Sequence, residues 1–83
     1  MQITLKLYAM LTDYLPANAE KNISRLDVAE GTSVGKVIKD LRMPQELVHL
    51  VLLNGVYVEH DRLADTPLTD GDVLAVWPPV AGG

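Results

Sequence analysis

The chain contains no cysteine and no phenylalanine, and only one tryptophan, among its 83 residues. Without cysteine there can be no disulfide, thiolate metal site or cysteine nucleophile. A chain of this length forms one domain, and folding buries roughly 60–65% of the surface that the unfolded chain exposes. That is enough for one modest core and too little for a core with a deep pocket.

Positive charge is also scarce, with 7 Lys and Arg side chains against 11 Asp and Glu, which leaves a net charge of −4. This balance argues against nucleic-acid binding, which needs a basic stripe. The uncharged stretch over residues 73–83 contains two prolines and is too short to cross a bilayer, and the N-terminus lacks the apolar run of a signal peptide. We therefore expect a soluble cytoplasmic protein with neither a nucleic-acid nor a membrane partner.

Alternation of apolar and polar side chains predicts strands near both ends of the chain. Residues 3–8 alternate regularly, and residues 23–28 alternate with one slip, which predicts a bend or a ragged start there. A last strand is expected over residues 73–77, where Pro78 and Pro79 end it because proline cannot donate to a β-ladder. The apolar alternation of the first and last strands favours the middle of the sheet.

The middle of the chain predicts a helix and a hairpin. Val34, Val37, Ile38 and Leu41 share one helical face, and Thr32 or Ser33 can cap its N-terminus. The apolar run over residues 50–53 is typical of a central strand buried on both faces. Asn54-Gly55 then predicts a tight turn into a short strand over residues 56–58.

These elements, with one or two helical turns over residues 9–15, predict an α+β fold with one main helix packed on one face of a mixed sheet of about four to five strands. Residues 59–72, otherwise a polar segment with a turn at its end, carry five acidic side chains against one arginine, and hence the whole net charge. One interpretation is turn chemistry on a solvated surface. The other is an acidic patch that steers docking onto a basic partner.

No catalytic or metal-binding constellation is evident. His49 lies among apolar residues and is typical of a packing or capping residue, and Glu59-His60-Asp61 offers adjacent side chains that diverge on a strand. We therefore predict no bound metal and no directly bound cofactor. No glycine-rich phosphate loop precedes a helix either.

The sequence ends in an unusual way, with Gly82-Gly83 after an uncharged stem that begins at Pro78 and Pro79. One interpretation is a frayed terminus. The other is a tail for a narrow channel of another protein, because the prolines form a stiff spacer and glycine hinders attack on an activated carboxylate least. Without a resemblance, these features leave both interpretations open.

Three segments resemble the small subunits of molybdopterin synthase, within the ubiquitin-like sulfur carriers. They are residues 54–58, residues 66–73 and the ending Val76-Trp77-Pro78-Pro79-Val80-Ala81-Gly82-Gly83, with further similarity at Tyr8-Ala9 and over residues 30–34. The Pro-Pro-Val-Ala-Gly-Gly ending is far more specific than a bare Gly-Gly pair. The resemblance implies a β-grasp domain over residues 1–78 and a flexible C-terminal tail over residues 79–83.

The resemblance also implies a mechanism. A ubiquitin-activating-type adenylyltransferase would use ATP and magnesium to adenylate the carboxylate of Gly83, and a sulfur donor would convert the adenylate to a thiocarboxylate. The tail would then enter the large subunit of molybdopterin synthase and give its sulfur to the dithiolene of molybdopterin. Partner contacts would come from Trp77, Pro78, Pro79, Val80, Ala81 and Gly82, and the catalytic side chains would belong to the partners.

Two features leave alternatives open. Family members often have phenylalanine before the Pro-Pro pair, and Trp77 in that place is either a core residue or a partner contact. Related carriers also serve tungsten cofactor, thiazole, cysteine and tRNA thiolation, and some are attached to lysines as protein modifiers. A plain adaptor that binds through its sheet is a further possibility, and in any of these the sheet face is expected to contribute to docking.

Overall fold

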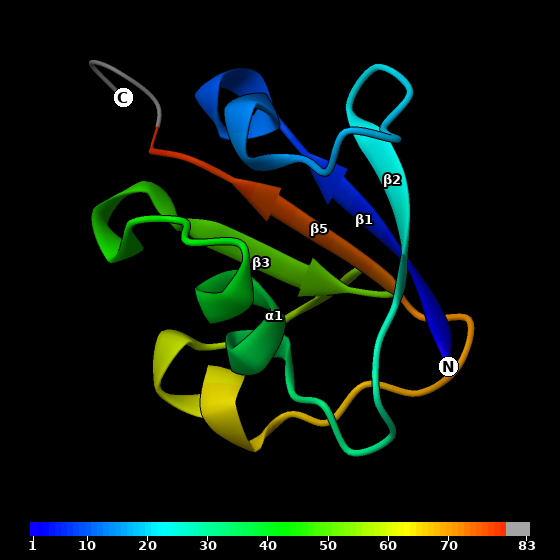
Figure 1. Cartoon of the computed structure of the whole chain (residues 1–83). Coiled ribbons are helices and arrows are strands. Elements are labelled where there is room, and N and C mark those ends of the chain that lie inside the picture. Colours follow the sequence, from blue (N-terminus) through cyan, green and yellow to red (C-terminus); the bar gives the residue numbers. More distant parts are fainter. Residues whose placement is uncertain (80–83) are drawn as a thin grey trace.

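The computed structural model describes residues 1–79, which form a five-stranded mixed sheet with one α-helix across one face (Figure 1). The sheet order is β2-β1-β5-β3-β4, in which β1 and β5 are parallel and every other neighbouring pair is antiparallel. The elements are β1 (Gln2–Leu7), the 3-10 helix η1 (Ala9–Tyr14), β2 (Ile23–Asp27), α1 (Val34–Asp40), the 3-10 helix η2 (Gln45–Leu47), β3 (Leu50–Leu53), β4 (Val56–Tyr57), the 3-10 helix η3 (His60–Asp65) and β5 (Val73–Trp77).

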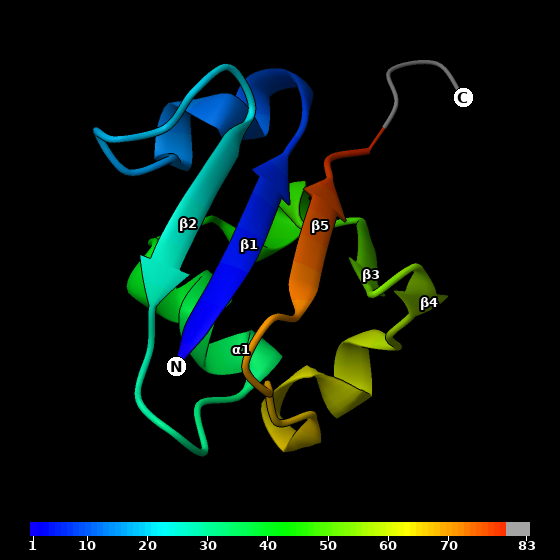
Figure 2. The same ribbon diagram turned by 90° about the vertical axis from the view of Figure 1, so that its right-hand side faces the viewer.

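The two terminal strands lie side by side within the sheet, as their alternation predicts (Figure 2). Leu5 is in register with Leu74, and Leu7 with Val76, and these four side chains are fully buried beneath α1. Because successive strand residues point to opposite faces, the residues between them lie on the face away from the helix. The first and last strands therefore build the centre of the core.

The predicted helix forms as α1, and Ser33, one of the two candidate N-cap residues, caps its N-terminus. The backbone N–H of Lys36 donates to Ser33 Oγ at 3.0 Å. Val34, Val37 and Ile38 are buried against the sheet. The predicted Asn54-Gly55 turn joins β3 to β4, with φ of 53° and 83° at the two residues, as a type I′ hairpin requires.

Three features differ from the sequence expectation. In β3 only Val51 is buried, so the strand is not buried on both faces, because the outer face of the sheet carries no second layer. The slip suggested by the sequence of residues 23–28 is not present in β2, because Ser24 rather than Ile23 faces the core. The Ser24 hydroxyl donates to Asn18 Oδ1 at 3.0 Å. The polar segment after β4 contains a 3-10 helix, η3, which packs against α1.

Candidate functional site

The last strand, β5, leads into the stem of the predicted tail and is held on both sides up to its final residue. The Tyr8 N–H donates to the Val76 carbonyl at 3.3 Å, and the His49 N–H donates to the Trp77 carbonyl at 2.9 Å. Figure 1 shows β5 running between β1 and β3 toward the C-terminal end of the chain. The sheet therefore sets the direction in which the chain leaves β5.

The stem begins with one buried and one exposed proline. Pro78 is buried against the domain, whereas Pro79 is exposed. The other predicted tail residues, Val80, Ala81, Gly82 and Gly83, lie outside the described residues, so their assigned roles stay predictions. The predicted boundary between the domain and the tail, after residue 78, also stays a prediction.

Trp77 lies on the outer face of the sheet, opposite α1, and is half-buried. Its ring stacks on that of Tyr8, with ring centroids 4.1 Å apart and ring planes 5° from parallel. Of the two alternatives that the sequence leaves open, this position favours a surface residue, because the buried core lies on the other face of the sheet. The aromatic pair adjoins the stem directly.

An apolar outer-face patch continues from this aromatic pair across β5 and β3. Its members are Tyr8, Leu50, Leu52, Ala75 and Trp77. Leu50 is in register with Trp77 and Leu52 with Ala75, and both leucines are half-buried. No element of the described chain covers this face (Figure 2). Apolar residues on an uncovered sheet face are of the kind expected at a docking surface. The sequence signal that could have found them is the apolar run of β3, because the single predicted helix covers only one face of the sheet and leaves every second residue of that run uncovered.

The end of the acidic segment, residues 69–72, lies away from the stem, because it forms the turn before β5 and the stem leaves the other end of that strand (Figures 1 and 2). Its residues do not act as one cluster, because Asp72 is buried and accepts hydrogen bonds from Asn54 and Thr69. The Asn54 amide, followed by the Thr69 N–H, lowers the pKa of the Asp72 carboxyl. Asp70 Oδ1 accepts from the Gln2 N–H at 2.8 Å. Two of the five acids are therefore used in turn structure.

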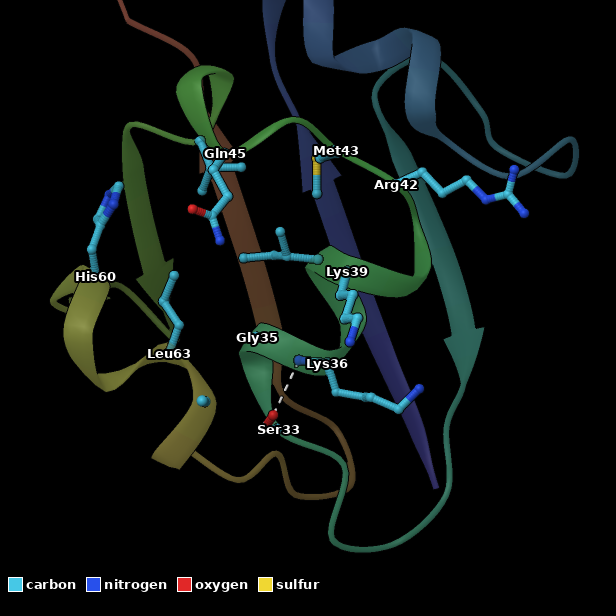
Figure 3. Close-up of a pocket in the computed structure, with 12 residues that line it drawn as sticks. Ser33, Gly35, Lys36, Lys39, Arg42, Met43, Gln45, His60 and Leu63 are labelled. Atoms are coloured by element: carbon cyan, nitrogen blue, oxygen red, sulfur yellow. Dashed lines mark hydrogen bonds between the residues drawn. The ribbon is translucent and has the colours of Figure 1, made fainter.

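A groove of about 780 Å³ lies on the helix side, between α1, η2 and η3 (Figure 3). Its apolar lining includes Ile38, Met43 and Leu63, whereas the Lys36 and Arg42 side chains extend away from it in Figure 3. Lys36 Nζ is paired with Asp40 at 2.7 Å. The groove is separate from the stem and the outer-face patch, and it offers no arrangement suited to the chemistry of a C-terminal carboxylate.

Residues 1–79 contain no group of three or more histidine or acidic side chains placed to hold a metal ion. In the same part of the chain, His60 Nε2 lies 2.8 Å from the His49 carbonyl, which holds η3 to the start of β3. Within this range no helix has the length and apolar character needed to cross a membrane.

Comparison with known proteins connects these features. The chain matches the model of the ThiS family over residues 15–83, whereas no curated protein sequence matches it. Among solved structures, the thiamine biosynthesis protein ThiS of Geobacter metallireducens is 26% identical with a TM-score of 0.67. SAMP1 of Haloferax volcanii is 25% identical with a TM-score of 0.69, and both alignments cover 100% of each chain.

A third structure is the complex of subunits 1 and 2 of the molybdopterin-converting factor of Helicobacter pylori. The matched chain is 20% identical, with a TM-score of 0.61 and 100% coverage of both chains, and at that identity it shows the fold alone.

The sheet order, the single main helix and these structural matches define a β-grasp protein of the ubiquitin-like class. The chain belongs to the ThiS family, and it is a ubiquitin-like sulfur carrier.

Proposed function

We propose that this chain is the sulfur-carrier subunit of a molybdopterin synthase. The observation that carries the proposal is the sequence Trp77-Pro78-Pro79-Val80-Ala81-Gly82-Gly83, which follows β5 without a charged side chain. A stem of this kind, leaving the sheet beside an uncovered apolar patch, suits insertion into a partner while the sheet face docks. The domain over residues 1–78 would dock, and residues 79–83 would be the part that enters the partner.

The proposed activation has two chemical steps when the donor supplies sulfide, and a third when it supplies a persulfide. A carboxylate oxygen of Gly83 attacks the α-phosphorus of ATP, which forms a C–O–P linkage and releases magnesium pyrophosphate. A persulfide or sulfide of the sulfur donor then attacks the acyl carbon, and AMP leaves with the shared oxygen. If the donor is a persulfide, a second thiol cleaves the S–S bond, and a disulfide on the donor side is the oxidised product. The thiocarboxylate stays on Gly83.

The chain's own contribution to these steps is placement. Gly82 and Gly83 leave the acyl carbon unhindered, whereas ATP and magnesium are bound by the adenylyltransferase. The reaction on the pterin precursor uses side chains of the synthase large subunit. Once the sulfur is bonded to the precursor, water cleaves the acyl–sulfur bond and supplies the oxygen with which the carrier regains its carboxylate. Because this chemistry uses ATP and an intracellular precursor, we assign the protein to the cytoplasm.

Intact-mass spectrometry tests the carrier chemistry directly. The chain is incubated with a ubiquitin-activating-type adenylyltransferase, ATP, magnesium and a sulfur donor. We expect a mass increase equal to the exchange of one oxygen for sulfur, mapped by fragmentation to Gly83. No increase, with the same enzyme shown competent on another carrier, would favour the plain adaptor.

The acceptor is tested separately, with the purified thiocarboxylate form. Addition of a molybdopterin synthase large subunit and cyclic pyranopterin monophosphate should regenerate the carboxylate and yield the dithiolene product. A thiocarboxylate that persists here but is consumed in thiazole, cysteine or tRNA thiolation assays, or in a tungsten-cofactor system, assigns the chain to that pathway.

Protein modification is the second candidate, and the 25% identity to SAMP1 over the whole chain favours its inclusion. A second solved structure of the Haloferax volcanii protein gives its name as small archaeal modifier protein 1. A modifier forms isopeptide bonds between the Gly83 carboxyl group and lysine amines of other proteins. Peptide mapping of cell extracts for lysines that bear the C-terminal residues of this chain distinguishes it from a dedicated carrier.

A further inference from the structure

The aromatic pair at the base of the stem is built into the domain itself. Tyr8 follows β1 and Trp77 ends β5, and their rings stack with 4.1 Å between centroids and 5° between planes. We propose that Tyr8 is a positioning residue for the C-terminal tail, and that its stack on Trp77 aims the stem for activation of Gly83. The inference rests on the proposed function, because it assigns a role in that activation.

The backbone contacts place this stack at the last point where the sheet controls the chain. Tyr8 donates its N–H to Val76, and His49 donates its N–H to Trp77, so both flanking strands hold β5 to its end. Pro78 and Pro79 have no N–H to donate, and their rings restrict φ. The direction of the chain after Trp77 therefore follows from how Trp77 is held.

The stack acts at the start of the stretch that ends in Gly83. Gly83 is six residues beyond Trp77, a reach of at most about 20 Å when extended. The backbone from Trp77 to Pro79 therefore determines the side of the domain from which Gly83 can approach an activating enzyme. Misplacement of a reacting group by about 1 Å can cost two orders of magnitude in rate, so a fixed start of the stem has a kinetic benefit.

The side-chain geometry supports a brace within the chain rather than isolated surface aromatics. Both rings are half-buried on the outer face, and the nearly parallel stack covers one face of the indole. Without Tyr8, Trp77 would lose that contact on a face where no other layer of the described chain restrains it. Ordering the stem would then be left to the activation step, which would slow it.

Substitutions at Tyr8 separate a brace from a simple apolar contact with the partner. Tyr8→Phe keeps the stacking ring, whereas Tyr8→Leu keeps an apolar side chain and removes the stack. Tyr14→Leu is the matched control, because Tyr14 is a partly buried tyrosine of η1 that packs on the core. Urea unfolding of each variant establishes that the assays use folded protein.

Activation is measured by ATP–pyrophosphate exchange with the ubiquitin-activating-type adenylyltransferase and magnesium, as the carrier concentration is varied. We expect Tyr8→Leu to lower kcat by about 3- to 10-fold, from the loss of an aromatic pair, with KM changed by less than about twofold. Tyr8→Phe and Tyr14→Leu should match the unmodified chain. An unchanged kcat for Tyr8→Leu, or a higher KM alone, overturns the positioning role.

The free protein provides a second readout that needs no enzyme. Trp77 is the only tryptophan, so time-resolved fluorescence anisotropy reports the motion of its ring alone. Tyr8→Leu should increase fast indole motion, and Tyr8→Phe should not. Equal motion in both variants contradicts the brace. If a competent enzyme does not activate the unmodified chain, the proposed function fails. The anisotropy measurement then still tests the Tyr8–Trp77 stack, because it needs no enzyme.

Discussion

The side-chain amide of Asn54 donates to the carboxylate of Asp72 at 2.9 Å, which ties the β3–β4 hairpin to the turn before β5. The same asparagine accepts from the Val73 N–H through its Oδ1 atom at 2.8 Å. Asp72 also accepts from the N–H and hydroxyl groups of Thr69. One buried carboxylate thus joins two turns that are distant in sequence. It lies just before the start of β5, whereas the stem follows the end of that strand.

This relationship predicts an acid-sensitive contribution to stability. Because the hydrogen bonds lower the folded-state pKa of Asp72, the ionised group stabilises the fold above the unfolded-state pKa, about 3.9. The contribution is lost as pH falls through the lower folded-state value. Asp72→Asn should therefore lower the free energy of unfolding at pH 7 by about 1–3 kcal/mol, measured by urea unfolding.

The pH series provides the control for that prediction. The difference between Asp72→Asn and the unmodified chain should narrow as the pH falls through the folded-state pKa of Asp72. Asp61→Asn, an exposed acid in η3, should stay within about 0.5 kcal/mol throughout. A difference for Asp72→Asn that is independent of pH would show that charge has no part in it.

Gly35 is predicted to be required by the packing of α1 on η3. A Cβ at this position would lie 3.1 Å from the Ala64 backbone nitrogen and 3.1 Å from the Leu63 carbonyl carbon. Alanine usually stabilises a helix by up to about 1 kcal/mol relative to glycine. Here we expect Gly35→Ala to destabilise by about 1–3 kcal/mol, through forced separation of two backbones, with a lower Tm.

The control for this substitution is Lys39→Ala, at an exposed position on the same helix. It should change the free energy of unfolding by less than about 0.5 kcal/mol. A Gly35→Ala protein as stable as the unmodified chain would mean that η3 moves aside without cost.

Deletion of Gly83 separates carrier chemistry from folding. The shortened chain should accept no sulfur, because its new C-terminal residue ends short of the reacting position in the activating enzyme. Its free energy of unfolding should change by less than about 0.5 kcal/mol, because the sheet and core of residues 1–79 are expected to fold without the last residue. Intact mass and urea unfolding measure the two effects, and a deletion that unfolds the domain counts against the carrier role.

The outer-face patch predicts a binding defect without a chemical one. Leu52→Glu places a charge among apolar side chains beside Ala75, so we expect at least about tenfold weaker binding to the adenylyltransferase. In contrast to Tyr8→Leu, KM should rise and kcat should persist. Arg25→Gln, an exposed position on the same face but on β2, which contributes no patch residue, is the control. Equal KM for the two variants would remove the patch from the docking surface.

Much of the fold follows from local patterns that act over a few residues. Alternation placed β1 and β5, helical spacing and Ser33 placed α1, and Asn54-Gly55 placed the hairpin turn. Each of these signals is physical and short-range, because it depends on side-chain direction, an N-cap acceptor or a backbone conformation with positive φ. The family-like C-terminal ending could also be recognised without any coordinates.

The sequence by itself thus determined the order of the main elements, the single helix and the chemistry expected at Gly83. Only the tertiary structure decided which faces are covered, because burial depends on residues far apart in the chain. It put Ser24 rather than Ile23 toward the core, left Leu52 on an open face and built η3 against Gly35. It also brought Tyr8 onto Trp77, a contact that exists because β1 and β5 are parallel neighbours in the sheet.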